Sequence, residues 1–174
     1  MISKKMEKAL NEQIALEGTA SFIYLAMAAW CDTQGLEGCT QFMHRQSDEE
    51  KMHMLKIYEY LSEVDGVAIT PAIAQPNQTY KSVQTMFKTV YEHEKKVTAS
   101  IHKLISLANK EGDQTTFNFL QWYVSEQREE ENLMRSILDK IKLIGEGPHS
   151  LYYIDKEIAS INAQELAAEG EEGA

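Results

Sequence analysis

Four apolar patterns of helical spacing in this sequence are each interrupted near the middle by carboxylate or amide side chains. In the third pattern, Glu94 takes a position that the spacing assigns to a core side chain. The second contains Glu50 and His53 as Glu-x-x-His, which places both side chains on one helical face. The first and fourth patterns are interrupted by Glu17, and by Gln127 with Glu130. Four polar interruptions at matching heights indicate a single site.

The residue types at this site favour a bound metal ion. A buried carboxylate without a partner is energetically costly, and it takes up a proton unless a positive charge lies nearby. None of the four patterns has a basic residue at a core position. We therefore expect the positive charge to come from outside the chain. Carboxylates with a single imidazole suit iron, manganese or magnesium better than a metal that prefers thiolates.

The elements that must position these residues are four long helices. The spacing predicts them roughly over Ser3–Asp32, Gly38–Val64, Lys81–Lys110, and from Asp113 or Gln114 to Ile144. Strand patterns are absent, so the predicted fold class is all-α. Helices of this length are typical of a bundle.

The connections between the helices predict the topology. Only a few residues join the first helix to the second and the third to the fourth, so each pair should form an antiparallel hairpin. The connection over residues 65–80 reaches about 50 Å when extended, whereas a helix of about 28 residues is about 42 Å long. One long crossover can therefore span the bundle and leave the second and third helices parallel. The polar interruptions, each near the midpoint of its helix, then converge at the centre.

A short fifth helix is predicted for Ser150–Ile161, where apolar residues recur at helical spacing. A helix this short needs a partner surface to be stable. We therefore predict one domain over residues 1–162, followed by an acidic, disordered tail over residues 163–174.

Composition narrows the classes of partner. The chain has 174 residues, which suits one domain, and 43% of them are hydrophobic. A net charge of −10 argues against a nucleic-acid partner, since phosphate contacts need clustered Lys and Arg. No apolar run approaches the roughly 20 residues of a membrane span, and the N-terminus has no apolar signal region. We therefore expect a cytoplasmic protein without membrane contact. Cys31 and Cys39 form no CxxC pair and are expected to be unlinked thiols.

Several motifs together resemble those of bacterial non-haem ferritins of the heavy-chain-like type. They are Glu17 followed by Tyr24, Glu49-Glu50-Lys51-Met52-His53, Tyr91-Glu92-His93-Glu94, and Asn118-Phe119-Leu120-Gln121-Trp122-Tyr123-Val124-Ser125-Glu126-Gln127. The resemblance covers roughly residues 1–160. It implies a ferritin-like four-helix bundle with one long crossover, of which twenty-four copies form a hollow cage. It also implies iron storage, with a ferroxidase that oxidises Fe(II) using oxygen or hydrogen peroxide and deposits ferric mineral inside the cage.

The resemblance also implies a role for individual residues. Glu17 and His53 would bind the first iron, Glu50 would bridge two irons, and Glu94 and Glu130 would bind the second. Beside these two irons would lie Tyr24 and Gln127. A third iron site towards the cavity would be formed by Glu49, Glu126 and Glu129.

Three alternative functions are open at this point. A bacterioferritin would bind haem through a methionine directly after the glutamate of the second helix, but Lys51 stands there, so no haem is expected. A rubrerythrin-like peroxidase would carry a second Glu-x-x-His, where this chain has Gln127-x-x-Glu130. The third alternative is a structural helical bundle without catalysis, which would have no need to retain this set of carboxylates.

Overall fold

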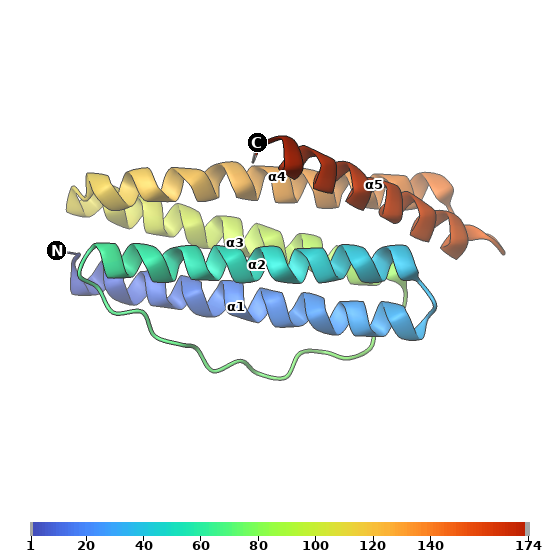
Figure 1. The fold of residues 1–174 in the computed structure, drawn as a ribbon, viewed down its shortest axis with the longest axis horizontal. Helices are drawn as coiled ribbons and strands as arrows, with labels where there is room; N and C mark the ends of the chain where they lie inside the picture. Colours follow the sequence, from blue (N-terminus) through green and yellow to red (C-terminus); the bar gives the residue numbers. More distant parts are fainter. Residues whose placement is uncertain (1, 173–174) are drawn as a thin grey trace.

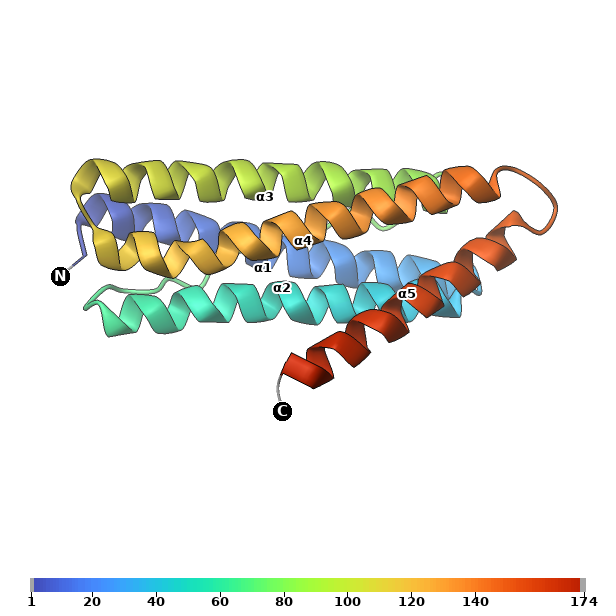
Figure 2. The same ribbon diagram turned by 90° about the horizontal axis from the view of Figure 1, so that it is seen from above.

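The computed structural model describes residues 2–172, with side chains described for residues 2–168, and this part of the chain contains five helices and no strand. The long helices are α1 (Lys4–Thr33), α2 (Glu37–Glu63), α3 (Val83–Glu111) and α4 (Gln114–Ile144). They lie side by side as a four-helix bundle, and α5 (Ser150–Glu172) crosses one side of it (Figures 1 and 2). The predicted all-α bundle is confirmed.

The helices begin where side chains satisfy free backbone amides. Ser3 Oγ accepts a hydrogen bond from the amide of Met6 at 3.0 Å, which makes Ser3 the N-cap of α1 as the sequence predicts. Ser82 and Asp113 cap α3 and α4 in the same way. Gly112 ends α3 in the left-handed region, with φ of 68°, where a side chain would be strained. All four long helices begin and end within two residues of their predicted bounds, and for α1, α3 and α4 such local signals at the start explain the agreement.

The chain traces two antiparallel hairpins joined by one long crossover. Helices α1 and α2 form the first hairpin, and α3 and α4 form the second. Residues 64–82 run along the length of the bundle between them, so α2 and α3 point the same way (Figure 1). The side chain of Asn11 holds the start of this crossover, because it donates to Val67 O at 2.9 Å and accepts from Ile69 N at 2.6 Å.

Helix α5 is longer than the sequence predicts. Ile154, Ile158 and Ile161 are buried in an apolar cluster formed by the second halves of α1 and α4 and the first halves of α2 and α3. The predicted end at Ile161 is wrong, because the residues that follow are mostly Ala, Gln, Glu and Leu, which continue a helix once it is anchored. Residues 163–172, predicted as a disordered acidic tail, are helical, and residues 173–174 lie outside the described residues. The domain boundary at residue 162 stays a prediction.

The core of the bundle consists of two apolar clusters, one towards each end. The first surrounds Tyr24, Phe42 and Phe87, and the second surrounds Leu10 and Leu61. Between the two clusters, each long helix carries a buried polar side chain near its middle. The bundle is therefore stable through apolar packing at its two ends and has polar residues at its centre.

Among residues 2–172, one helix, α1, is long and apolar enough to cross a membrane by length and composition. This corrects the expectation that no segment of the sequence approaches a membrane span. Within the bundle, 56% of its most apolar window is buried. A helix that packs in a protein core passes the same test, because its small and apolar residues face its neighbours.

Candidate metal centre

A layer of polar side chains crosses the bundle between the two apolar clusters. Helices α1 and α2 contribute Glu17, Glu50 and His53, and helices α3 and α4 contribute Glu94 and Glu130. Each of these side chains is at most 4% exposed. Because inward positions recur every three to four residues, the spacing that seats the apolar core also turns these side chains inward. Each hairpin supplies only part of the layer.

Three of these residues form a close group. Glu17, Glu50 and His53 offer ligand atoms that all lie within 4.8 Å of one another. One carboxylate oxygen of each Glu and both ring nitrogens of His53 have no hydrogen-bond partner among the residues described. Buried polar atoms in folded proteins normally have such a partner. Unpartnered lone pairs brought this close together are suited to bind a cation.

The carboxylate of Glu94 is held from two sides. The hydroxyl of Tyr24 donates a hydrogen bond to its Oε1, and Gln127 Nε2 donates to its Oε2 at 3.1 Å. Neither Glu94 nor Glu130 is within the close group, but the charge of each raises the pKa of Glu50, so both lie near it. Tyr24 and Gln127 therefore contact a candidate ligand, and their roles stay predictions.

A second group lies beside the first and shares its imidazole. Glu49, His53 and Glu126 offer ligand atoms within 4.8 Å of one another, and Glu126 Oε2 lies 3.8 Å from His53 Nε2. Glu129 does not join them. Its side chain is exposed, with Oε1 at 3.4 Å from Arg128 Nη2. The structure thus brings together two of the three residues predicted for a third iron site.

Burial perturbs the acidity of the whole layer. It raises the pKa of Glu17 to about 7, and a hydrogen bond from Gln13 partly offsets this rise. Burial is also the largest cause of the raised pKa values of Glu50, Glu94 and Glu130, and neighbouring carboxylates raise all three further. The carboxylates therefore bind protons more readily than free ones, and a cation would release those protons.

The imidazole of His53 is shifted in the opposite direction. Burial lowers its pKa to about 4, because the charged form is poorly solvated there. His53 is therefore neutral at pH 7 and keeps a lone pair for a metal. The edge-to-face contact with Trp122, with centroids 5.3 Å apart, helps to fix the ring plane.

Sequence reasoning missed two residues that support Glu17, the buried Gln13 and the half-buried Ser100. Gln13 Nε2 donates to Glu17 Oε1 at 2.8 Å, and Ser100 Oγ of α3 in turn donates to Gln13 Oε1 at 2.6 Å. Gln13 is fully buried. The four-residue spacing between Gln13 and Glu17 is a signal that could have identified the first of them.

Sequence reasoning also missed a cation close to the layer. Arg45 Nη1 lies 3.0 Å from Glu49 Oε2, and the side chain of Arg45 is only 11% exposed. Its charge partly offsets the rise in the pKa of Glu130. The expectation that all positive charge comes from outside the chain is therefore wrong. Arg45 lies beside the apolar stripe of α2 rather than in it, and its long side chain reaches inward from there.

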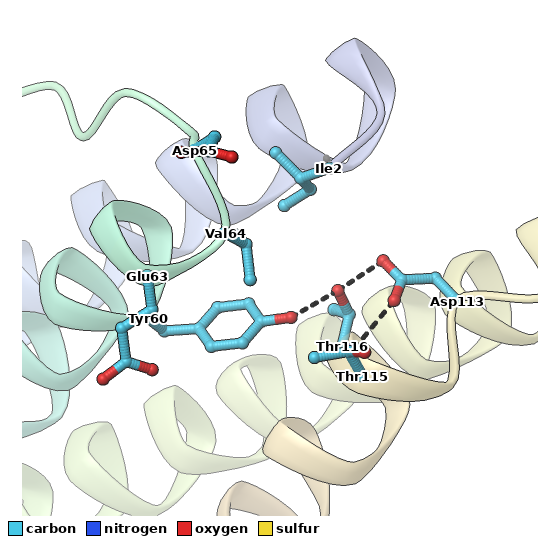
Figure 3. A pocket seen from close by; sticks show the side chains of 8 residues that line it. All are labelled: Ile2, Tyr60, Glu63, Val64, Asp65, Asp113, Thr115 and Thr116. Carbon is cyan, nitrogen blue, oxygen red and sulfur yellow. Dashed lines mark hydrogen bonds between the residues drawn. The ribbon is translucent and has the colours of Figure 1, made fainter.

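A separate pocket of about 230 Å³ opens where α2 ends and α4 begins (Figure 3). It contains acidic residues, but Asp113 is already engaged as the cap of α4, since both of its oxygens accept hydrogen bonds from Thr116. Tyr60 and Thr116 share a further hydrogen bond of 2.7 Å. This pocket is therefore a structural junction, and the unpartnered ligand atoms lie in the central layer instead.

The donor set of the central layer suits a hard or borderline cation such as Fe(II). It supplies carboxylate oxygens and one neutral imidazole, and no thiolate is present in either close group. Carboxylates on several helices can hold two metal ions within one cluster, and the pair can then act together on a bound oxidant.

Comparison with known proteins extends over nearly the whole chain. Residues 7–144 match the ferritin family, described as a ferritin-like domain. A probable bacterial non-heme ferritin-like protein of Haemophilus influenzae is 44% identical over 164 residues, which are 94% of this chain and 99% of that protein. The bacterial non-heme ferritin of Campylobacter jejuni is 45% identical over 161 residues, which are 92% of this chain and 96% of that protein.

A solved structure agrees with these sequence relatives. An open pore ferritin from the hyperthermophilic archaeon Archaeoglobus fulgidus superposes with a TM-score of 0.88 at 43% identity, covering 91% of this chain and 96% of that chain. Residues 7–144, which match the ferritin family, include every residue of the polar layer.

Proposed function

The chain belongs to the ferritin family, as the motifs predict, and we propose that it stores iron as a ferroxidase subunit of a protein cage. It would oxidise Fe(II) at the polar layer and pass ferric iron to a mineral inside the cage. The observation that carries the proposal is the group of Glu17, Glu50 and His53, whose unpartnered ligand atoms lie within 4.8 Å of one another.

Each residue of the layer has a proposed part in handling two Fe(II) ions as substrate. Glu17 and His53 hold the first ion, Glu50 bridges both, and Glu94 and Glu130 hold the second. Two Fe(II) ions release two electrons, which together with two protons reduce oxygen to hydrogen peroxide, or hydrogen peroxide to two water molecules. Buried carboxylates favour Fe(III) over Fe(II), because the higher charge gains more from nearby negative groups.

The neighbouring residues assist this centre in the proposal. Tyr24 and Gln127 orient Glu94 through the hydrogen bonds that they donate to it. The second group, containing Glu49 and Glu126, would receive a third iron. Glu129 would join that site only by turning away from Arg128.

The chain assembles with copies of itself, as expected of a ferritin. We propose a cage of twenty-four copies, located in the cytoplasm. Exposed apolar side chains on α1 and α2 support such contacts, and Phe22 and Leu25 line a groove of about 510 Å³ between these helices and the crossover.

Aerobic addition of excess Fe(II) to the metal-free protein tests the proposal. Wild-type protein should oxidise Fe(II) faster than buffer does and keep many irons per chain in solution. Glu50→Ala should slow oxidation by at least about 100-fold, because one substitution removes a ligand shared by both ions. Glu12→Ala, at an exposed site on α1, should leave the rate unchanged. Equal rates for Glu50→Ala and wild type would contradict the proposal, and so would a haem band in the purified protein.

A further inference from the structure

Helix α5 is fixed against the start of α2 by an unusual cap. Helix α2 has no capping hydrogen bond from the side chain of its own N-cap residue. Instead the carboxylate of Asp155, on α5, accepts hydrogen bonds from the amides of Gly38 at 3.1 Å and Cys39 at 2.8 Å. A Cβ atom at Gly38 would lie 2.3 Å from the carbonyl oxygen of Asp155, so only glycine permits this approach. The first half of α5 therefore has one defined position on α2.

This position brings Asn162 onto the side chain of Arg45. Asn162 is buried, and its Oδ1 accepts a hydrogen bond of 2.8 Å from Arg45 Nε. The guanidinium carbon also lies 5.4 Å from the centroid of the Phe42 ring. The hydrogen bond to Asn162 of α5 and the contact with the Phe42 ring of α2 together hold the guanidinium in one place.

The held guanidinium contacts a carboxylate of the second metal-ligand group. Arg45 Nη1 lies 3.0 Å from Glu49 Oε2, and Glu49 belongs to the group with His53 and Glu126. Arginine carries its charge at every relevant pH. A divalent cation that binds Glu49 must therefore displace the guanidinium or remain beside a fixed positive charge. Either event weakens its binding.

We propose that Arg45, held by Asn162 of α5, is a built-in competitor that keeps iron binding weak at the group of Glu49, His53 and Glu126. This inference rests on the proposed function, because it concerns iron on its way from the oxidation centre to the mineral. It assigns α5 a part in that transfer, because the helix limits how long an iron ion stays at the second group, formed by Glu49, His53 and Glu126.

Anaerobic titration of the metal-free, fully assembled protein with Co(II), followed by its d–d absorption, tests the proposal. The binding step that disappears in Glu49→Gln identifies the second group. In Arg45→Gln that step should tighten about 10-fold, because the competing charge is removed. Arg45→Lys keeps the charge and should return the affinity close to that of wild type. Asn162→Ala should tighten the same step about 3-fold, and should add nothing in the Arg45→Gln background.

Two matched controls separate this effect from general changes. Arg135→Gln removes the same charge from an exposed site on α4, and Gln164→Ala changes an exposed residue on α5. Neither should alter the step. If Arg45→Gln leaves Co(II) binding unchanged or weakens it, Arg45 organises Glu49 instead, and the proposal is overturned. If Arg45→Gln does not fold, the other two variants decide. The proposal stands if Asn162→Ala tightens the Co(II) step while Arg45→Lys leaves it close to wild type, and it is overturned if Asn162→Ala leaves the step unchanged or weakens it.

The outcomes also distinguish this proposal from the proposed function. Wild-type protein that oxidises Fe(II) but shows no Co(II) step sensitive to Glu49→Gln contradicts only the competitor role. Wild-type protein that does not oxidise Fe(II) contradicts the ferroxidase itself.

Discussion

Glu17 shows how one buried carboxylate couples proton binding to metal binding. Because its pKa is about 7, the metal-free protein holds a proton on this residue about half of the time at neutral pH. A cation must displace that proton before it can use both oxygens. Iron affinity at the close group should therefore fall as the pH drops below 7.

Glu17→Gln tests the same coupling through stability. The pKa of this carboxyl is about 7 in the folded protein against a reference value of 4.5. The stability that protonated Glu17 contributes is therefore fully present below pH 4.5 and is lost as the pH rises through 7. Glutamine stays neutral, so the variant should resemble wild type near pH 4 and exceed it by up to about 3 kcal/mol at pH 8. Denaturant unfolding of metal-free protein at both pH values measures the difference.

Glu12→Gln is the control for this measurement, since Glu12 is exposed on the same helix. It should show the same small difference from wild type at both pH values. A stability difference for Glu17→Gln that does not change with pH would mean that Glu17 is ionised in the folded protein throughout.

Tyr24→Phe probes the support of Glu94. The substitution removes the hydroxyl that donates to Glu94 Oε1 but keeps the ring in its apolar cluster. A hydrogen bond to a charged group contributes about 1.5–3 kcal/mol, so Fe(II) binding at Glu94 should weaken at least about 10-fold while the fold is retained. Anaerobic calorimetry with Fe(II) measures the affinity. Tyr80→Phe, which removes an exposed hydroxyl, should bind as wild type does, and an equal loss in both variants would argue against a specific role for Tyr24.

At this scale, the sequence predicts inward-facing carboxylates better than the residues that support them. Glu94 could be identified because a charge in an apolar stripe breaks a simple period. Ser100 breaks no such pattern, and only its packing against Gln13 reveals its contact with the layer. Arg45 lies beside the stripe, so the reach of its side chain depends on where α5 presents Asn162.

At the scale of elements, α5 supplies the N-terminal cap that the residues next to α2 do not provide. Asp155→Ala should lower the free energy of unfolding by about 1–2 kcal/mol, because the first amides of α2 lose their cap. The side chain in Asp155→Asn can still accept a hydrogen bond, so its free energy of unfolding should fall by less. The remaining loss is mainly the attraction between a carboxylate and the helix dipole. Chemical denaturation provides the comparison. Asp139→Ala, at an exposed site on α4, should have little effect, and an equal loss there would contradict the capping role.

Helix ends that are set by nearby residues could be predicted from the sequence, whereas ends that depend on contacts with another helix could not. Ser3 and Gly112 bound their helices through local hydrogen bonds and backbone conformation, and both ends could be predicted. Helix α5 has no such stop signal after Ile161, and its length depends on the surface of α2 that receives it. The crossover could be predicted because its length alone permits it to span the bundle.

At the scale of the whole molecule, oxidation and storage should be separable. Every residue of the polar layer comes from a single chain, whereas a mineral cavity needs many copies. Phe22→Asp places a charge on an exposed apolar face of α1 and should produce smaller assemblies. These should still oxidise Fe(II) within about threefold of the wild-type rate, but the iron should precipitate.

Light scattering during size-exclusion chromatography, together with iron counted per soluble chain, tests this separation. Gln121→Asp introduces the same charge at an exposed site on α4 and should leave both assembly and storage intact. If disassembled Phe22→Asp no longer oxidises Fe(II), the centre depends on contacts between copies and the separation is wrong.

The division of the polar layer between two hairpins has a consequence for protein engineering. Glu17, Glu50 and His53 come from α1 and α2, whereas Glu94 and Glu130 come from α3 and α4, and only the crossover of residues 64–82 connects the two sets. Two separately expressed half-chains, cut within that crossover, would each hold an incomplete ligand set. Both apolar clusters contain residues from each half, so the two halves should associate even without metal. Ferrous iron should then tighten that association, because its ligands come from both halves, and a fluorophore pair placed on the two halves would report the change.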